Sequence, residues 1–190
     1  MNKTKELIFQ TTIKMINEAD SDPTKITIRD ISKQADIAVS QINYHFQSKE
    51  NLISQCVELM VKDIIGLYDN NLKNLENLIN FDKLKYMANL TYSFLYDNEN
   101  LARISIISDY QNAKADDNTW QTMNAYFPLI EKICEERNIQ DAWLVTELLV
   151  LALQSAFLRT DILQEELSIN LRNPEERKQF INKVLELYLR

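Results

Sequence analysis

Chain breakers and reactive side chains are scarce in this chain of 190 residues, which has one glycine, three prolines, two cysteines and one histidine. So few glycines and prolines argue against a β fold with many turns and favour long helices. The sequence also contains no Gly-rich phosphate loop, no nucleophile elbow and no paired-carboxylate motif that stands out. We therefore expect a protein that is not an enzyme and that needs no cofactor or metal.

The cysteines and the most apolar segment are interpreted as interior features. Cys56 and Cys134 lie far apart in apolar-periodic stretches, which fits buried thiols better than a metal or redox site. The stretch 142–158 is shorter than the about 20 residues that span a bilayer, and it contains Glu147 and Gln154. We interpret it as a helix buried on most sides and expect no membrane partner. The N-terminal stretch lacks a signal-peptide run, so we expect a cytoplasmic protein.

Charge is distributed unevenly along the chain. The formal net charge is −7, which by itself argues against a nucleic-acid partner. Residues 1–50, however, hold as many lysines and arginines as aspartates and glutamates, so residues 51–190 carry the whole net charge. The two parts are therefore expected to face different partners. Residues 1–50, the head, are neutral overall but can bind DNA if their cations gather on one face.

Apolar residues recur at spacings of three and four along most of the chain, which predicts an all-α fold. Thr27 is a suitable N-cap with Asp30 in a capping-box position, and Asp36 tolerates the left-handed conformation that ends a helix. Ser48 should cap a long fourth helix, and Pro174 suits a first helical position. The predicted helices cover about residues 3–19, 27–35, 38–45, 48–72, 82–96, 99–112, 117–137, 140–162 and 174–189.

The stretch IAVSQINYHFQSKENL, residues 37–52, contains the only histidine among several polar side chains. Three short helices with a tight turn between the second and third describe a helix-turn-helix unit, whose last helix enters the major groove of DNA. Ile42 and Phe46 are expected to face the core, so the other side chains of this helix face outward or flank the core. The candidate DNA-contacting residues are Thr27, Val39, Ser40, Gln41, Asn43, Tyr44, His45 and Lys49.

These candidates differ in the contact that each side chain can make. The Ser, Gln and Asn side chains can hydrogen-bond to base edges, and Val39 can touch a thymine methyl group. Thr27, Tyr44 and His45 could bind phosphate oxygens, as could Lys49 in the first turn of the next helix. Alternatives stay open: His45 as a core or capping residue, Tyr44 packed beneath the first helix, and Lys49 as a solvated helix-end lysine.

Residues 27–53, TIRDISKQADIAVSQINYHFQSKENLI, follow a first helix containing IFQTTIKMI and resemble the tetracycline-repressor-like (TetR) family of bacterial transcriptional regulators. The step INYHF followed by SKE carries the resemblance, which covers about residues 5–55. This sequence departs from the family pattern where Asp36 replaces a frequent glycine. It departs again where Ala38 replaces the usual Ser or Thr, which weakens the cap of the recognition helix.

The resemblance implies a helix-turn-helix DNA-binding domain over residues 1–50. It also implies an effector-binding and dimerisation domain, a helical bundle, over residues 51–190. By the same resemblance the protein is a homodimeric repressor that binds palindromic double-stranded operator DNA and is released by an unknown small-molecule effector. The alternative is a helical adaptor that uses its head to bind protein instead of DNA.

Two segments of the second part are expected to form the dimer contact. The stretch 142–158 has too little polar surface for the outer helix of a monomer, and the last predicted helix adds several apolar residues. We expect a homodimer that associates through about residues 140–162 and 174–189. The alternative is a single buried helix inside a monomeric bundle.

The effector pocket is expected among the middle helices. Most large side chains there should be plain core, while the tyrosine hydroxyls suggest an amphipathic or aromatic ligand. The acidic balance of the chain favours a cationic or neutral ligand over an anion. The candidate ligand-binding residues are Tyr86, Tyr92, Tyr110, Trp120, Met123 and Phe127.

Two helix-breaking residues fall inside predicted helices. Pro128 should kink or divide the helix over residues 117–137. Gly66, the only glycine, marks either close packing, the end of the fourth helix, or a flexible point between the two parts.

Overall fold

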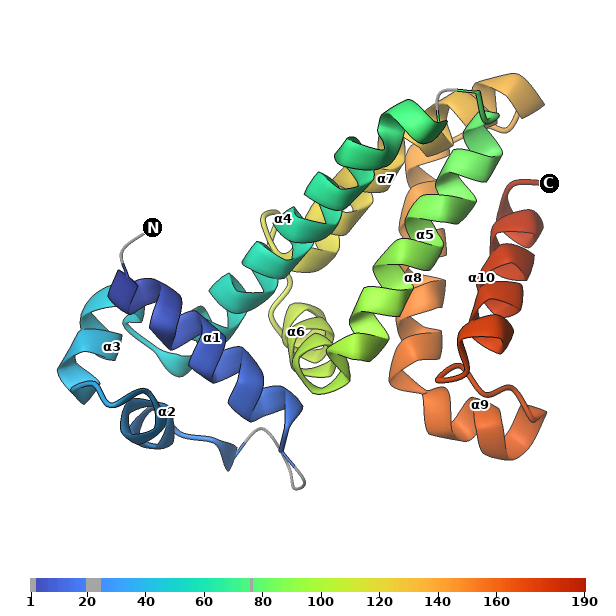
Figure 1. Ribbon diagram of the computed structural model, residues 1–190. Helices are drawn as coiled ribbons and strands as arrows, with labels where there is room; N and C mark the ends of the chain where they lie inside the picture. The colour runs from blue at the N-terminus through green and yellow to red at the C-terminus, as the bar shows by residue number, and fades with distance from the viewer. Residues whose placement is uncertain (1–2, 20–24, 76) are drawn as a thin grey trace. The chain divides into compact units, whose positions relative to one another are not determined.

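The computed structural model describes residues 3–19, 25–75 and 77–190, without the side chains of residues 60, 61, 63–65, 67–69 and 70–74. The described residues form ten helices and no strand, so the predicted all-α fold is confirmed (Figure 1). They divide into two compact units, one made of residues 1–62 and 98–113, the other of residues 63–97 and 114–190. Helix α4, Lys49–Leu75, contributes to both units.

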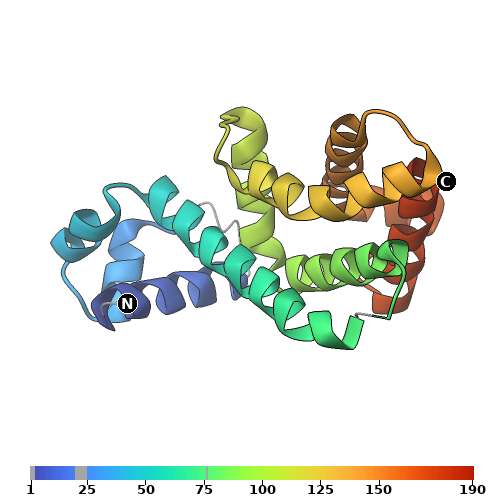
Figure 2. The same ribbon diagram turned by 90° about the horizontal axis from the view of Figure 1, so that it is seen from above.

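The first unit contains α1 (Lys3–Asn17), α2 (Ile28–Ala35), α3 (Val39–Phe46), the start of α4, and α6 (Glu99–Gln111). Helix α2 packs against α1 and α3, and α6 packs against α1 (Figures 1 and 2). Two hydrogen bonds fasten the start of α6 to the end of α1: Asn100 Nδ2 donates to the Ile16 carbonyl at 3.1 Å, and Asn17 Nδ2 donates to Asn98 Oδ1 at 2.7 Å. The core residues of this unit are Ile8, Phe9, Ile16, Ile31, Ile42, Phe46, Leu52, Cys56, Leu101 and Ile106.

The second unit contains α5 (Asn80–Asp97), α7 (Asn118–Arg137), α8 (Ala142–Leu158), α9 (Thr160–Leu167) and α10 (Pro174–Tyr188). Helices α5, α7, α8 and α10 pack as a bundle, in which α7 lies against α5 and α8, and α10 lies against α5 and α8. Its core residues include Leu84, Met87, Tyr126, Ile130, Leu149, Leu153, Phe157, Ile181 and Leu185.

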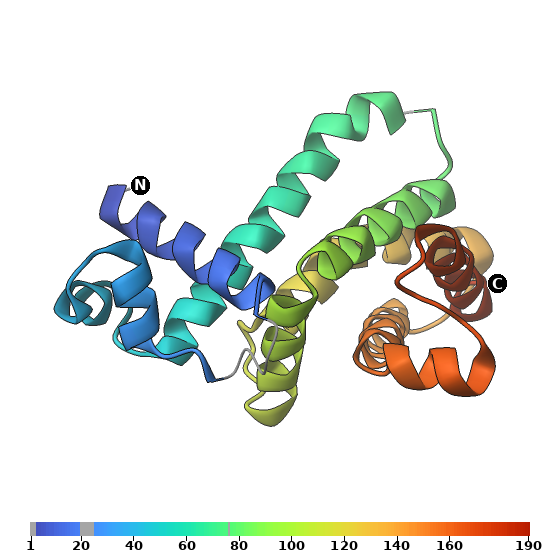
Figure 3. The same cartoon turned by 60° about the horizontal axis from the view of Figure 1, so that its bottom comes forward.

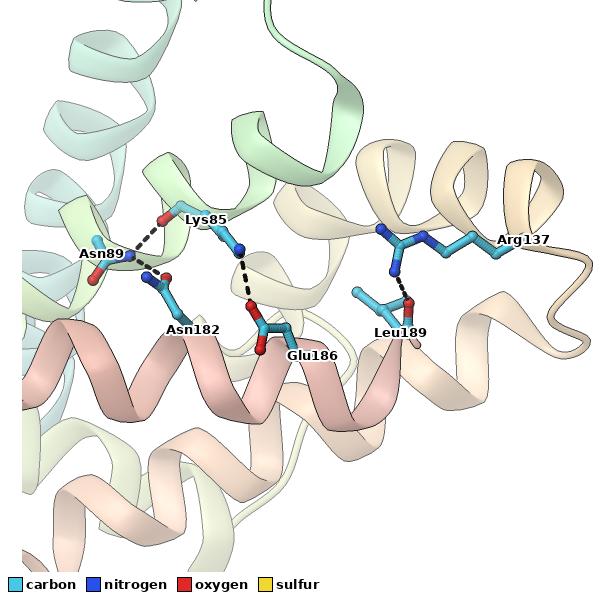
Figure 4. Close-up of polar contacts among 6 residues, drawn as sticks. All are labelled: Lys85, Asn89, Arg137, Asn182, Glu186 and Leu189. Atoms are coloured by element: carbon cyan, nitrogen blue, oxygen red, sulfur yellow. Dashed lines mark hydrogen bonds and ion pairs between the residues drawn. The ribbon is translucent and has the colours of Figure 1, made fainter.

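Polar contacts hold the last helix against the bundle (Figure 4). Lys85 Nζ pairs with Glu186 Oε1 at 3.1 Å, and Asn89 Nδ2 donates to Asn182 Oδ1 at 3.1 Å. At the C-terminal end of α10, the guanidinium of Arg137 donates to the carbonyl of Leu189. The position of α10 relative to α5 and α7 is therefore specified by hydrogen bonds as well as by its apolar face.

One predicted helix is divided in the structure. The stretch 140–162 is not one helix, because α8 ends at Leu158 and α9 leaves at an angle of 77° (Figure 3). The buried Thr160 hydroxyl donates to the Phe157 carbonyl at 2.8 Å and helps to end α8 there. Of the two effects predicted for Pro128, a division of the helix is excluded, because α7 continues from Asn118 to Arg137. Buried side chains on both sides of Pro128, such as Tyr126 and Ile130, hold α7 together through packing.

No single helix in the described ranges is both long and apolar enough to cross a bilayer. The only described candidate is α8 together with α9, which meets the length and composition required only as a bent pair.

Candidate DNA-binding site

Helix α2 starts at a complete capping box. The Thr27 hydroxyl accepts from the backbone N–H of Asp30 at 3.3 Å and donates to Asp30 Oδ2 at 2.7 Å. Asp30 Oδ2 also accepts from the backbone N–H of Thr27 at 2.9 Å. These hydrogen bonds lower the pKa of the Asp30 carboxyl, the side-chain bond being the stronger cause. The prediction of a Thr27 cap is confirmed, and the Thr27 hydroxyl proton is used within that cap.

The turn between α2 and α3 is set by the residues that follow Ala35. Asp36 adopts the left-handed conformation, with φ 52° and ψ 49°, as predicted. The backbone N–H of Ile37 returns to the Ser32 carbonyl at 3.1 Å, and Ser32 Oγ donates to the Ile37 carbonyl at 2.5 Å. This reciprocal pair closes the α2 C-terminus in the manner of a Schellman motif and directs the chain into α3.

Helix α3 is anchored by two fully buried side chains, Ile42 and Phe46. The Phe46 ring meets the Phe9 ring of α1 edge to face, with centroids 5.1 Å apart. The Lys5 ammonium lies 5.4 Å from the centroid of Phe46 and 5.5 Å from that of Phe9. The N-cap residue Ala38 makes no side-chain capping bond, as its sequence predicts, so α3 is held by its buried face instead.

The opposite face of α3 is the candidate DNA-binding surface, composed of Val39, Ser40, Gln41, Asn43 and Tyr44. All five residues are exposed, and Tyr44 is 83% exposed. The alternative in which Tyr44 packs beneath the first helix is therefore wrong. The amides and hydroxyls on this face offer both donors and acceptors, the chemistry that reads base edges in a major groove.

The end of α3 brings His45 and Lys49 near this surface. His45 is half-buried, and its ring contacts those of Tyr44 and Phe46, with centroids 5.1 Å and 6.1 Å away. Lys49 is the first residue of α4, whose start is capped by Ser48 Oγ accepting from the Asn51 N–H at 3.1 Å. Asn51 Nδ2 also donates to the Phe46 carbonyl at 2.8 Å, which fixes the start of α4 against the end of α3.

The candidate ligand residues do not form one group. Tyr110 belongs to the first unit, and the other five, Tyr86, Tyr92, Trp120, Met123 and Phe127, belong to the second. Trp120 and Phe127 both pack edge to face against Trp143, each with centroids 5.0 Å apart. Sequence reasoning missed Trp143 because it lies in the apolar stretch assigned to the dimer contact.

Comparison with known proteins finds a family match for the helix-turn-helix segment. Residues 8–56 match the family model of bacterial regulatory proteins, tetR family. No curated protein gives a significant sequence match. Solved structures share the fold of nearly the whole chain. FadR from Thermus thermophilus, a TetR-family repressor in complex with lauroyl-CoA, has a TM-score of 0.68 at 10% identity, covering 94% of this chain and 93% of that one.

Two further solved structures agree. The regulator FadR from Bacillus subtilis in complex with stearoyl-CoA has a TM-score of 0.66 at 16% identity, with 97% of both chains covered. A TetR transcription regulator from Haloarcula marismortui has a TM-score of 0.66 at 15% identity, with 100% of both chains covered. Residues 8–56 therefore carry the helix-turn-helix segment of the tetR family of bacterial regulatory proteins, and the solved structures share the fold of the chain.

Proposed function

We propose that this protein is a homodimeric repressor that binds a palindromic operator through α3 and is released by a small-molecule effector. The observation that carries the proposal is the two-sided character of α3. One side, with Ile42 and Phe46, is fully buried, and the other exposes consecutive hydrogen-bonding side chains and Tyr44. A fixed helix with a polar, exposed face fits the major groove, whose width admits one α-helix.

Each DNA contact follows from side-chain chemistry. Gln41 and Asn43 carry amides that can pair bidentately with adenine, and Ser40 can bond to either purine or pyrimidine edges. Val39 supplies a methyl contact to thymine. The phosphate contacts are assigned to Tyr44, His45 and Lys49. Because the Thr27 hydroxyl and N–H both donate to Asp30, the contact predicted at Thr27 falls to the backbone N–H groups that follow it in the first turn of α2.

A second copy of the chain is proposed to associate along α8 and α10. On α8, Leu144 is 50% exposed and Leu148 is 44% exposed, and these residues lie four positions apart on one helix face. On α10, Leu187 is 68% exposed. Exposed leucines on two helices of one bundle support an apolar contact between identical subunits. Two heads related by a two-fold axis would bind half-sites about 10 bp apart or at a multiple of that spacing.

An effector is proposed to bind in the second unit, residues 63–97 and 114–190. Two regulators of the same fold carry acyl-CoA in their solved structures, which supports a small-molecule effector for this chain without identifying it. Residues 1–50 would then serve as the DNA-binding part and residues 51–190 as the effector-binding and dimerisation part.

Fluorescence anisotropy with the duplex upstream of the protein's own gene tests the proposal. Binding should weaken with salt, with a log–log slope of about −0.9 per phosphate contact. Lys49→Ala should weaken binding to all duplexes alike, Asn43→Ala should change the sequence preference, and Lys132→Ala on the exposed side of α7 should change neither. Failure to bind any duplex, or a salt-independent interaction, would favour the helical adaptor.

A further inference from the structure

Arg177, in the first turns of α10, is a buried cation without a carboxylate partner. Its side chain belongs to a residue that is 6% exposed, and no ion pair to it forms within the described ranges. The neighbouring Glu176 carboxylate instead accepts from the backbone N–H of Asn170 at 2.9 Å. Because an arginine is almost never buried unless it is paired, the missing negative charge calls for an explanation.

The protein satisfies only part of the hydrogen-bonding capacity of Arg177. Nη1 donates to the carbonyls of Leu171 at 3.0 Å and Arg172 at 3.3 Å, and Nη2 donates to Ser93 Oγ at 3.4 Å. A guanidinium has five N–H groups, so donors remain on Nε and Nη2. These adjacent nitrogens form the edge that pairs with both oxygens of a carboxylate.

The Arg177 side chain lines a small cavity between α5, α8 and α10. The cavity holds about 10 Å³, room for about one water molecule. Its other walls are apolar or aromatic and include Tyr92, Tyr96, Leu153, Phe157, Phe180 and Ile181. The exposed surface of the cavity is therefore almost wholly apolar, and the Arg177 side chain forms part of one wall.

Tyr96 packs against the Arg177 guanidinium. Its ring centroid lies 4.6 Å from the Arg177 guanidinium carbon, and its own ring meets Phe157 edge to face at 5.0 Å. The Thr160 hydroxyl donates to the Phe157 carbonyl, so the Tyr96 hydroxyl is the donor in its 2.7 Å bond to Thr160. This chain of contacts keeps the Tyr96 ring over one face of the guanidinium.

We propose that this cavity is the effector site and that the effector is an amphipathic carboxylate. Its carboxylate would pair with Arg177, and its apolar chain would lie among the aromatic and aliphatic walls. The local charge thus favours an anion, although the net charge of the chain is negative. The inference rests on the proposed effector-responsive function and names the ligand class for it.

The cavity is too small for a ligand beyond a few atoms, so binding must widen it by moving the helices that line it. Helices α8 and α10 both contribute walls, and both carry the exposed leucines of the proposed dimer contact. A ligand that separates α8 from α10 would change the surface that meets the second subunit. A ligand bound in this cavity would thus change the association of the two subunits without contacting DNA.

Calorimetric titration of the full chain, without DNA, tests the site with three probes of one chain length. These are octanoate, the neutral octanamide and the cationic octylammonium. Octanoate should bind best, and Arg177→Gln should weaken its binding about tenfold or more, as expected for a lost charge-assisted contact. Arg177→Lys should retain part of the affinity. Arg172→Gln, which alters a neighbouring exposed arginine, should leave it unchanged.

A second variant keeps the test valid if Arg177→Gln fails to fold. Ala156 lines the cavity, and Ala156→Val should fill it, preserve the fold by circular dichroism and abolish octanoate binding. Equal affinity for octanoate and octanamide, or unchanged octanoate affinity in both Arg177→Gln and Ala156→Val, would overturn the proposal. Operator binding is measured separately, so a protein that binds DNA but not octanoate refutes this site while leaving the proposed regulator intact.

Discussion

The rings of Phe9 and Phe46 meet edge to face with their centroids 5.1 Å apart, and this contact couples α1 to the last residue of α3. Phe46 has no exposed surface, whereas Tyr44, two residues earlier on the same helix, is 83% exposed. Two side chains of one short helix thus have different roles: Phe46 stabilises the first unit, and Tyr44 is available to a binding partner.

This difference in role predicts opposite phenotypes for two aromatic substitutions. Phe46→Ala should lower the free energy of unfolding by about 3–5 kcal/mol, because it leaves a cavity in the core of the head. Tyr44→Ala should change stability by less than about 0.5 kcal/mol but weaken DNA binding. Chemical denaturation and anisotropy on the same samples measure both effects. Equal destabilisation by the two substitutions would contradict the assignment of the two faces.

The capping box predicts that removing the Thr27 hydroxyl lowers the stability of the protein modestly and that serine restores most of it. Thr27→Ala removes the side-chain bond to the Asp30 N–H and should cost about 1 kcal/mol in urea unfolding, while Thr27→Ser should restore most of it. The folded-state pKa of Asp30 lies below its ordinary value. The ionised carboxylate therefore stabilises the folded protein above that ordinary value, and this stabilisation is lost as the pH falls through the folded-state pKa. The Thr27→Ala protein should therefore lose less stability on acidification than the wild type; an equal loss would argue against the box.

Cys56 predicts sensitivity to alkali. Burial raises the pKa of its thiol from 9.0 to about 12, so the neutral thiol is favoured in the folded state. The stability that the buried neutral thiol contributes is fully present below pH 9. It is lost as the pH rises toward 12, at up to about 1.4 kcal/mol per pH unit for one group. Unfolding curves between pH 9 and 11 should show this decline, and Cys56→Ala should flatten it. The native thiol should also resist alkylation at pH 8.

Gly66 predicts a stabilising substitution. It lies inside α4 and not at a helix end, and a Cβ added to it meets nothing within 4 Å among the described atoms. The close-packing interpretation therefore finds no support among the described atoms. Gly66→Ala should raise the free energy of unfolding by about 1 kcal/mol, because alanine favours the helix. The flexible-point hypothesis further requires that Gly66→Ala alter effector-induced release from DNA; unchanged release would refute it.

The exposed leucines of α8 predict the route of association. Leu148→Glu should shift the protein toward monomers in sedimentation velocity at micromolar concentration, because it introduces charge into an apolar contact. Leu167→Glu, on exposed α9, is the matched control and should leave the sedimentation coefficient unchanged. A wild-type protein that sediments as a monomer would contradict the proposed dimer outright.

The head was predictable because its signals are local. Capping by Thr27 and Ser48, the left-handed Asp36 and the spacing of Ile42 and Phe46 are each decided within a few residues. Such short-range preferences agree with the final fold, so reading them in order yields the helices and the outward face of α3.

The second unit was less predictable because its features depend on tertiary packing. No glycine or proline marks the bend between α8 and α9, and the polar residues 159–161 would also fit the exposed side of one continuous helix. Arg177 follows Pro174 and two glutamates and reads as an ordinary charge near a helix start, yet it is buried against Tyr96. Tyr110 shares the composition of the other ligand candidates but belongs to the first unit, a division that no residue spacing reveals.

Selection from a pool of random duplexes tests whether two copies of α3 bind a specific DNA sequence. We expect enrichment of an inverted repeat whose half-sites lie about 10 bp apart or at a multiple of that spacing. We also expect Asn43→Ala to alter one position in each half-site. Recovery of unenriched random sequence, with the wild-type protein folded and dimeric, would contradict sequence-specific binding by α3.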